Sequence, residues 1–197
     1  MNETSVLVIF AHPAFQRSRV NRALVEAASF VQGVKVHDLY ETYPDFLIDV
    51  EREQMLMENH QHIVLQHPFF WYSSPAIIKE WLDLVLTYGW AYGQHATALA
   101  GKTLAQATST GGPAEAYQRG GHNHFTVREL LAPFEQTARL CGMRYAEAYT
   151  VQGTNSLSVE DVATHASGYA HWLEALRDGE ANYWFTPTQG DPEESQS

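Results

Sequence analysis

The sequence has one cysteine, few basic residues and no long apolar run. Cys141 is the single cysteine among 197 residues, so the chain cannot close an intramolecular disulfide. Lysine and arginine number 12 against 23 acidic residues, and the net charge of −11 argues against a nucleic-acid binder. No stretch reaches the roughly 18 apolar residues of a membrane-spanning helix, and MNETSVLVIF lacks the basic start of a secretory signal. We therefore expect a cytoplasmic protein that binds small molecules or other proteins.

Two glycine-rich nucleotide motifs are also missing. Gly101, Lys102 and Thr103 resemble the end of a Walker A loop, but Ala96 stands where that loop has its first glycine. The triplet also precedes a predicted strand, whereas a Walker A loop precedes a helix. No G-x-G-x-x-G follows the first apolar run. A P-loop nucleotide hydrolase and a Rossmann dinucleotide site are therefore not supported.

The ten histidines do not form a metal-ligand pattern. The candidate groups are His60, His62 and His67, and His122 with His124. No cysteine, aspartate or glutamate completes a regular ligand spacing around either group. We expect no metal site.

Apolar periodicity predicts one domain over residues 1–184. Continuous apolar runs predict five strands, at 6–11, 34–40, 63–68, 103–110 and 143–153. Helical spacing predicts helices between and after them, at 20–31, 49–53, 75–89, 127–140 and 159–177. Pro75 begins one of these helices, and Pro133 marks a helix start or a kink. The polar, proline-containing segment 185–197 is expected to be a disordered tail.

The alternation of strands and helices predicts an α/β fold. It implies a five-stranded parallel sheet with right-handed crossovers and helices on both faces. Five such units fit the flavodoxin-like strand order 2-1-3-4-5, in which ligands bind at the carboxyl ends of the strands, beside the switch point between strands one and three. Three unusual clusters follow strands one, three and four. One convergent site is the economical interpretation.

The first cluster combines a serine, two arginines and the start of a helix. A helix N-terminus presents free amides and the positive end of the helix dipole, so Ser18 and the amides of Arg19, Val20 and Asn21 can hold a phosphate. Arg17 and Arg19 add positive charge to an acidic chain. The alternative is that Ser18 is a plain helix cap.

The second cluster is a run of four aromatic residues after the third strand. A strand cannot bury both faces of Phe69, Phe70, Trp71 and Tyr72, so some of these rings are expected to line a cavity for a flat ligand. The alternative is ordinary core packing beneath a loop.

The third cluster is a glycine turn after the fourth strand. In Ser109-Thr110-Gly111-Gly112-Pro113, the glycines would let backbone amides approach a ligand closely. By itself this segment is merely a turn.

Five motifs, in this order, resemble a known family. They are AHP at 11–13 with SRVN at 18–21, LYETYPDFLID at 39–49, QHPFFWYSSPAIIKEWLD at 66–83, GWAYG at 89–93 and TSTGGP at 108–113. Between about residues 5 and 151 the chain resembles the flavodoxin-like NAD(P)H:quinone oxidoreductases. Within that family it is most similar to the ancillary flavoproteins of glutathione-regulated potassium-efflux systems.

The resemblance implies FMN as the cofactor, in preference to FAD, and NAD(P)H as the co-substrate. His12 and the segment from Ser18 to Asn21 would contact the FMN phosphate and ribityl chain. Phe69 to Tyr72 and Ser109 to Gly112 would frame the isoalloxazine ring. The resemblance also implies a homodimer, in which Trp90 and Tyr92 of one chain cover the flavin of its partner. The alternative is that this loop folds back on its own core.

The resemblance further assigns the catalytic charge chemistry to a tyrosine and a histidine after the glycine turn. Tyr117 matches the family in its spacing from Gly112. His122 comes one residue earlier than in the larger mammalian-type enzymes, and His124 is a competing candidate.

Two functions follow from the resemblance. The first is two-electron, ping-pong hydride transfer from NAD(P)H, through FMN, to a quinone or a related electrophile. The second is that of a regulatory subunit, with little activity of its own, bound to a potassium-efflux antiporter. The second function would place the protein beside the inner membrane through its partner.

Overall fold

A twisted, mainly parallel sheet forms the centre of the protein. The computed structural model describes residues 5–187. Three central strands, β1 (Val6–Phe10), β3 (His62–Pro68) and β4 (Thr103–Ser109), are buried throughout, as expected for continuous apolar runs covered on both faces. The strand order is β2-β1-β3-β4-β5-β7, where β2 is Val34–Asp38. The predicted order 2-1-3-4-5 is therefore confirmed.

The number of strands differs from the predicted five. The last predicted strand is divided into β5 (Arg144–Ala146) and β6 (Tyr149–Val151), which both pair in parallel with β4. Between them, the amide of Glu147 bonds to the carbonyl of Asn182 instead of continuing the ladder. A seventh strand, β7 (Tyr183–Phe185), runs antiparallel to β5. Local periodicity does not reveal this edge strand because its pairing partner lies far away in the sequence.

Arginine side chains hold β7 against the sheet. Those of Arg144, Arg128 and Arg139 lie over the rings of Tyr183, Trp184 and Phe185, respectively. Phe185, the first residue of the expected tail, thus belongs to the sheet. Most of that tail, residues 188–197, lies outside the described residues.

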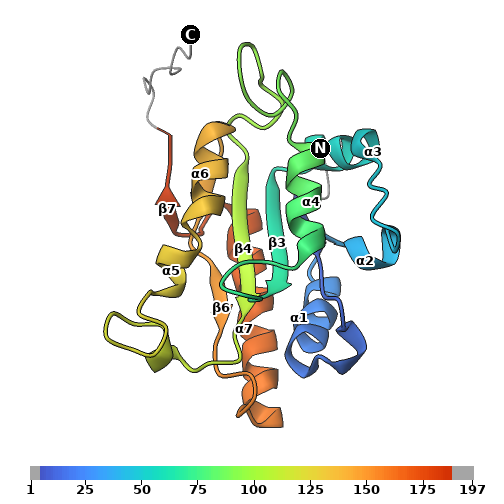
Figure 1. Cartoon of the computed structure of the whole chain (residues 1–197). Coiled ribbons are helices and arrows are strands. Elements are labelled where there is room, and N and C mark those ends of the chain that lie inside the picture. The colour runs from blue at the N-terminus through green and yellow to red at the C-terminus, as the bar shows by residue number, and fades with distance from the viewer. Residues whose placement is uncertain (1–4, 188–197) are drawn as a thin grey trace.

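Helices cover both faces of the sheet (Figure 1). Leu7 and Ile9 of β1 pack into one core and Val6 and Val8 into the other, because alternate side chains of a strand point to opposite faces. The second core is closed by α1 (Arg19–Ser29) and α7 (Val159–Asp178). The first is closed by the remaining helices: α2 (Leu39–Thr42), α3 (Val50–Glu58), α4 (Ala76–Val85), α5 (Val127–Leu130) and α6 (Ala132–Leu140).

Capping residues explain where several elements begin and end. The second strand ends two residues before its predicted end, because the carboxylate of Asp38 accepts bonds from the amides of Tyr40 and Glu41 and starts α2. Pro75 precedes α4, and Pro133 lies in the first turn of α6. Within residues 5–187, no helix is long and apolar enough to cross a membrane.

The strand directions separate two groups of loops. β1, β3 and β4 run parallel to one another, and the three clusters lie at the carboxyl ends of these strands (Figure 1). The long loop between α4 and β4, which contains GWAYG, lies at the opposite end of the sheet (Figure 1).

Candidate functional site

Direct hydrogen bonds join the three strand-end clusters. The side-chain amide of Asn21, in α1, donates to the hydroxyl of Ser109 over 2.9 Å. The backbone amide of Phe69 donates to the carbonyl of Ser109 over 2.8 Å. Asn21 and Ser109 are both buried. Segments about ninety residues apart therefore form one site, as the strand order requires.

The start of α1 combines a helix cap with open amides. The Ser18 hydroxyl accepts a bond from the Asn21 amide over 3.1 Å, so Ser18 is an N-cap. The amides of Arg19 and Val20 lie in the first turn of α1, where the helix provides no backbone carbonyl to accept their hydrogen bonds. The buried Oδ1 of Asn21 has no hydrogen-bond partner among the described residues. This end of α1 thus retains unused hydrogen-bonding groups at the positive pole of the helix.

Two basic or ionisable side chains near α1 are already engaged. The guanidinium of Arg19 donates to the carbonyl of Leu157, so this side chain points to the segment before α7. His12 Nδ1 accepts a bond from the amide of Ala14 over 3.1 Å. Burial lowers the pKa of His12, which favours a neutral ring with the proton on Nε2.

The aromatic cluster is a two-residue hairpin turn. Phe70 and Ser73 exchange two backbone bonds, and the residues between them, Trp71 and Tyr72, have φ of 49° and 63°. Positive φ at both central positions is typical of a type I′ turn, which usually contains asparagine or glycine. Bulky residues in this conformation indicate strain, which tends to occur at functional sites.

The turn displays its rings instead of burying them. Phe69 is buried in the core, whereas Phe70 and Tyr72 are partly exposed and Trp71 is 93% exposed. The core-packing alternative therefore applies to Phe69 alone. Trp71 presents its indole to solvent on a conformationally fixed turn.

The glycines of the third cluster make room for the chain itself. A Cβ at Gly111 would lie 3.2 Å from Nδ2 of Asn155, and one at Gly112 would lie 3.2 Å from the ring of Tyr117. The Thr110 hydroxyl donates to the carbonyl of Gly112 over 2.7 Å. The turn is therefore closely packed by side chains that follow β4 and β6.

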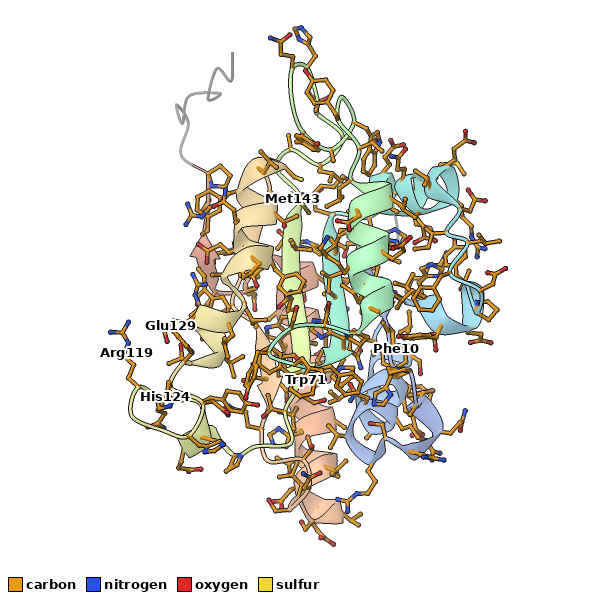
Figure 2. All side chains as sticks on the ribbon, viewed as in Figure 1. Phe10, Trp71, Arg119, His124, Glu129 and Met143 are labelled. Carbon is orange, nitrogen blue, oxygen red and sulfur yellow. The ribbon has the colours of Figure 1, made fainter. Side chains whose placement is uncertain are left out.

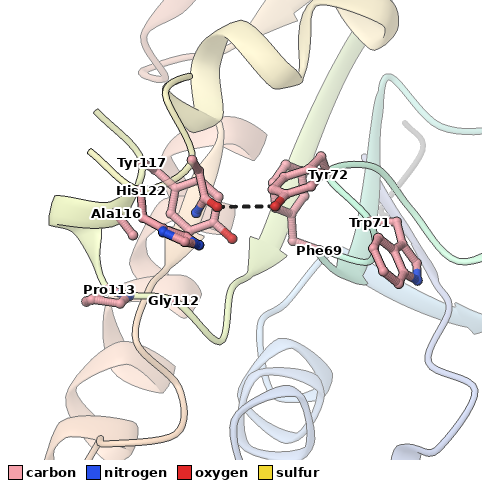
Figure 3. Close-up of a pocket in the computed structure, with 9 residues that line it drawn as sticks. Phe69, Trp71, Tyr72, Gly112, Pro113, Ala116, Tyr117 and His122 are labelled. Carbon is pink, nitrogen blue, oxygen red and sulfur yellow. Dashed lines mark hydrogen bonds between the residues drawn. The ribbon is translucent and has the colours of Figure 1, made fainter. Parts of the chain in front are cut away.

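A cavity of about 520 Å³ lies between the aromatic turn and the segment after the glycine turn (Figure 3). The Tyr72 hydroxyl donates to Asn123 Oδ1 over 3.2 Å at one side of it. The lining residues come from these two segments: Phe69, Trp71, Tyr72, Gly112, Pro113, Ala116, Tyr117, His122 and Asn123. The rings suit a flat ligand, and the polar groups can orient it.

Tyr117 and His122 reach the cavity together. Figure 3 shows both side chains on the same wall, facing Tyr72. Burial raises the pKa of Tyr117, so its hydroxyl is a neutral donor at physiological pH. His124 is not among the lining residues, and Figure 2 places it on the outer part of this loop, near Arg119. Arg119 pairs there with Glu129, which ties the loop to α5.

Trp90 and Tyr92 do not join the cavity of their own chain. Their loop lies at the amino end of the strands, and both rings pack against the chain's own core. Trp90 Nε1 donates to Glu58 over 2.7 Å.

Pro113, the last residue of the third cluster, lines the cavity as well. Sequence reasoning missed three contributors to this region: Ala116 and Asn123 line the cavity, and the side-chain amide of Asn155 lies beside Gly111. Thr154 and Asn155 directly follow the fifth predicted strand, so the rule that identified the other clusters could have found them. No group of three histidine, cysteine or acidic side chains in residues 5–187 is arranged to hold a metal ion.

Several known proteins are similar to this chain in sequence and in fold. A family model described as flavodoxin-like fold matches residues 4–176. The potassium-efflux ancillary protein KefG of Serratia proteamaculans is 45% identical over 168 residues, which are 85% of this chain and 92% of KefG. General stress protein 14 of Treponema denticola, solved in complex with FMN, is 40% identical with a TM-score of 0.84, over 87% of this chain and 99% of that one.

An NADPH-quinone reductase from P. pentosaceus is 33% identical with a TM-score of 0.78, over 86% of this chain and 97% of that one. These matches confirm the resemblance based on the sequence motifs. The chain belongs to the flavodoxin-like fold family, together with reductases and potassium-efflux ancillary proteins of nearly its own length.

Proposed function

We propose that this protein is an FMN-dependent NAD(P)H oxidoreductase that reduces quinones or related electrophiles by two-electron, ping-pong transfer. The observation that carries the proposal is the hydrogen-bonded convergence of three strand-end clusters beside an aromatic cavity. The FMN complex of a relative 40% identical to this chain supports the cofactor, and the NADPH-quinone reductase supports the substrates.

The residues present fit a flavin mononucleotide. The strained, 93% exposed Trp71 offers an uncovered ring face, which a flat isoalloxazine would shield from water. The open amides after Ser18 and the unpartnered Oδ1 of Asn21 offer bonds to the phosphate and to ribityl hydroxyls, respectively. Nε2 of neutral His12 can donate to a phosphate oxygen.

The chain would then serve as the orienting and polarising part of the site. FMN bound here would supply the redox chemistry, namely hydride acceptance from a nicotinamide and electron transfer to an acceptor. Tyr117, kept neutral by its raised pKa, donates a hydrogen bond toward negative charge that develops in the cavity. His122 shares its wall and supplies a second polar group. The aromatic turn excludes water from one side.

The proposal includes a homodimer. Trp90 and Tyr92 lie at the end of the sheet opposite to the cavity, so their chain cannot use them at its own site without rearrangement. A second copy would bring this loop to the first copy's cavity.

Absorbance spectroscopy of the purified protein tests the proposal. We expect a flavin spectrum that bleaches on anaerobic addition of NADH or NADPH and returns on addition of a quinone. The variant Trp71→Ala should bind FMN more weakly, whereas Phe30→Ala, an exposed aromatic at the far end of α1, should not. A protein that binds no added FMN would contradict the proposal.

The KefG match favours a second candidate, regulation of a membrane antiporter. Co-expression of the chain with a potassium-efflux antiporter should then increase efflux, and Tyr117→Phe should retain this effect while losing reductase activity. Unchanged efflux would exclude this candidate for the antiporter tested.

A further inference from the structure

A fourth strand-end segment holds the glycine turn of the site. The residues Gly153 to Ser156, between β6 and α7, lie beside the end of β4 (Figure 1). Neither the three sequence clusters nor the cavity lining includes this segment. We propose that it fixes the turn Thr110–Gly112 in the conformation that binds the flavin, and that Asn155 is its positioning residue. The inference rests on the proposed function.

Backbone bonds join the glycine turn to the end of β6 and to the first two residues of the fourth segment. The amide of Thr110 donates to the carbonyl of Val151 over 2.8 Å, which prolongs the pairing of β4 with β6 by one residue. The amides of Thr154 and Gly153 then donate to the carbonyls of Thr110 and Gly112, over 3.0 and 2.8 Å. The carbonyls of the turn therefore point to the fourth segment.

The side-chain amide of Asn155 occupies the space beside Gly111, the remaining residue of the turn. Its Nδ2 lies 3.2 Å from the point where a Cβ of Gly111 would be. A side chain at position 111 would displace this amide or shift the turn. The side chain of Asn155 is exposed, so neither the core nor a helix requires an asparagine here.

The residue that follows the segment, Leu157, is bonded to the first cluster. Arg19, in the first turn of α1, donates to the carbonyl of Leu157. The segment thus joins the glycine turn to the helix end proposed for the phosphate. If the glycine turn and the helix end are already ordered before FMN binds, the entropic cost of binding is smaller, and the affinity is higher.

A double-mutant cycle on FMN affinity tests the proposal. Asn155→Ala should weaken FMN binding to the apo-protein by roughly threefold to tenfold, measured by quenching of flavin fluorescence. Gly111→Ala should weaken binding as well. In the Asn155→Ala background Gly111→Ala should weaken it less, because the space beside Gly111 is then free. Asn59→Ala, an exposed asparagine at the opposite end of the sheet, is the matched control.

The midpoint potential of the bound FMN separates positioning from simple stabilisation. A loosened turn no longer aims its amides at the flavin, so Asn155→Ala should make this potential more negative, at a temperature well below unfolding. Unchanged affinity and potential in Asn155→Ala, or additive effects in the cycle, would overturn the inference alone. A wild-type protein that binds no FMN would overturn the proposed function as well.

Discussion

At the scale of single residues, the site is marked by backbone conformations that its amino acids seldom adopt. Trp71 and Tyr72 occupy left-handed conformations, where a Cβ costs about 1 kcal/mol. Trp71 also gains little from burial, since 93% of it is exposed. Tyr72 gains a hydrogen bond to Asn123, but no side-chain hydrogen bond or burial within residues 5–187 offsets the strain at Trp71. This pattern is expected of a residue whose side chain binds a ligand.

Trp71→Gly should therefore stabilise the apo-protein while weakening flavin binding. Glycine adopts this φ without the Cβ penalty, so we expect a gain of up to about 1 kcal/mol in the free energy of unfolding. Urea unfolding of the apo-protein measures it. The control Leu47→Gly replaces another exposed apolar residue, one without a positive φ, and should give no such gain. A destabilised Trp71→Gly variant would contradict the strain assignment.

A buried histidine should make stability depend on pH. Complete burial lowers the pKa of His67 to about 4, against 6.5 for an unhindered histidine. Between pH 6.5 and about 4, this histidine is protonated in the unfolded chain but stays neutral in the folded chain. The free energy of unfolding is therefore highest above pH 6.5 and decreases as the pH falls towards 4. Between pH 7 and pH 5 this residue should account for a loss of about 2 kcal/mol.

The variant His67→Leu should show a shallower decline of stability over this range, measured by urea unfolding at several pH values. His171→Leu changes an exposed histidine of α7 and should retain the wild-type slope. An unaltered slope in His67→Leu would show that the proton uptake occurs elsewhere.

At the scale of elements, a buried carboxylate joins β2, α3 and α4. Glu53, in α3, accepts bonds from His37 Nε2, the Tyr43 hydroxyl and Trp81 Nε1, over 2.8, 2.7 and 2.9 Å. Burial alone would raise the pKa of Glu53, but these bonds outweigh it and lower the pKa. The Glu53 carboxylate therefore stays ionised in the interior because three side-chain donors bond to it.

Loss of this acceptor should be among the most destabilising changes in the chain. Glu53→Ala leaves three buried donors without a partner, and we expect a loss of about 3–5 kcal/mol in the free energy of unfolding. Glu53→Gln keeps one acceptor oxygen and should lose less. Glu51→Ala, on the exposed side of the same helix, should change stability little. Chemical denaturation measures all three.

At the scale of the whole molecule, the proposed homodimer would bring the loop at one end of the sheet to the cavity at the other end of its partner's sheet. The cavity lies at the carboxyl end and the loop with Trp90 at the amino end. We expect a particle of about twice 22.2 kDa in solution, measured by light scattering.

Mixed dimers test whether the loop acts on the partner's site. Trp90→Ala and Tyr117→Phe should each lower reductase activity. If the loop covers the partner, a mixed dimer of these two variants contains one intact site, and co-refolded protein should be more active than either parent. A mixture no more active than its parents would contradict the assignment of this loop to the partner's site.

The sequence was sufficient for much of the fold because the central strands are continuous apolar runs. Val6–Phe10, His62–Pro68 and Thr103–Ser109 form where those runs occur, and their order follows from strands alternating with helices. The same reasoning placed three clusters at one edge. Apolar periodicity did not predict the edge strand Tyr183–Phe185, because this strand pairs with β5, which lies about forty residues earlier in the chain.

What the sequence determined by itself is the convergence of the three clusters, since parallel strands end at a common edge. The tertiary structure alone decided which side chains contribute to the site at that edge. His122 lines the cavity and His124 does not. Arg19 donates to the carbonyl of Leu157, and the side-chain amide of Asn155 lies beside Gly111. The reason is physical. Periodicity records which face of an element is apolar, but contacts between loops depend on turn geometry and on packing between segments distant in the chain.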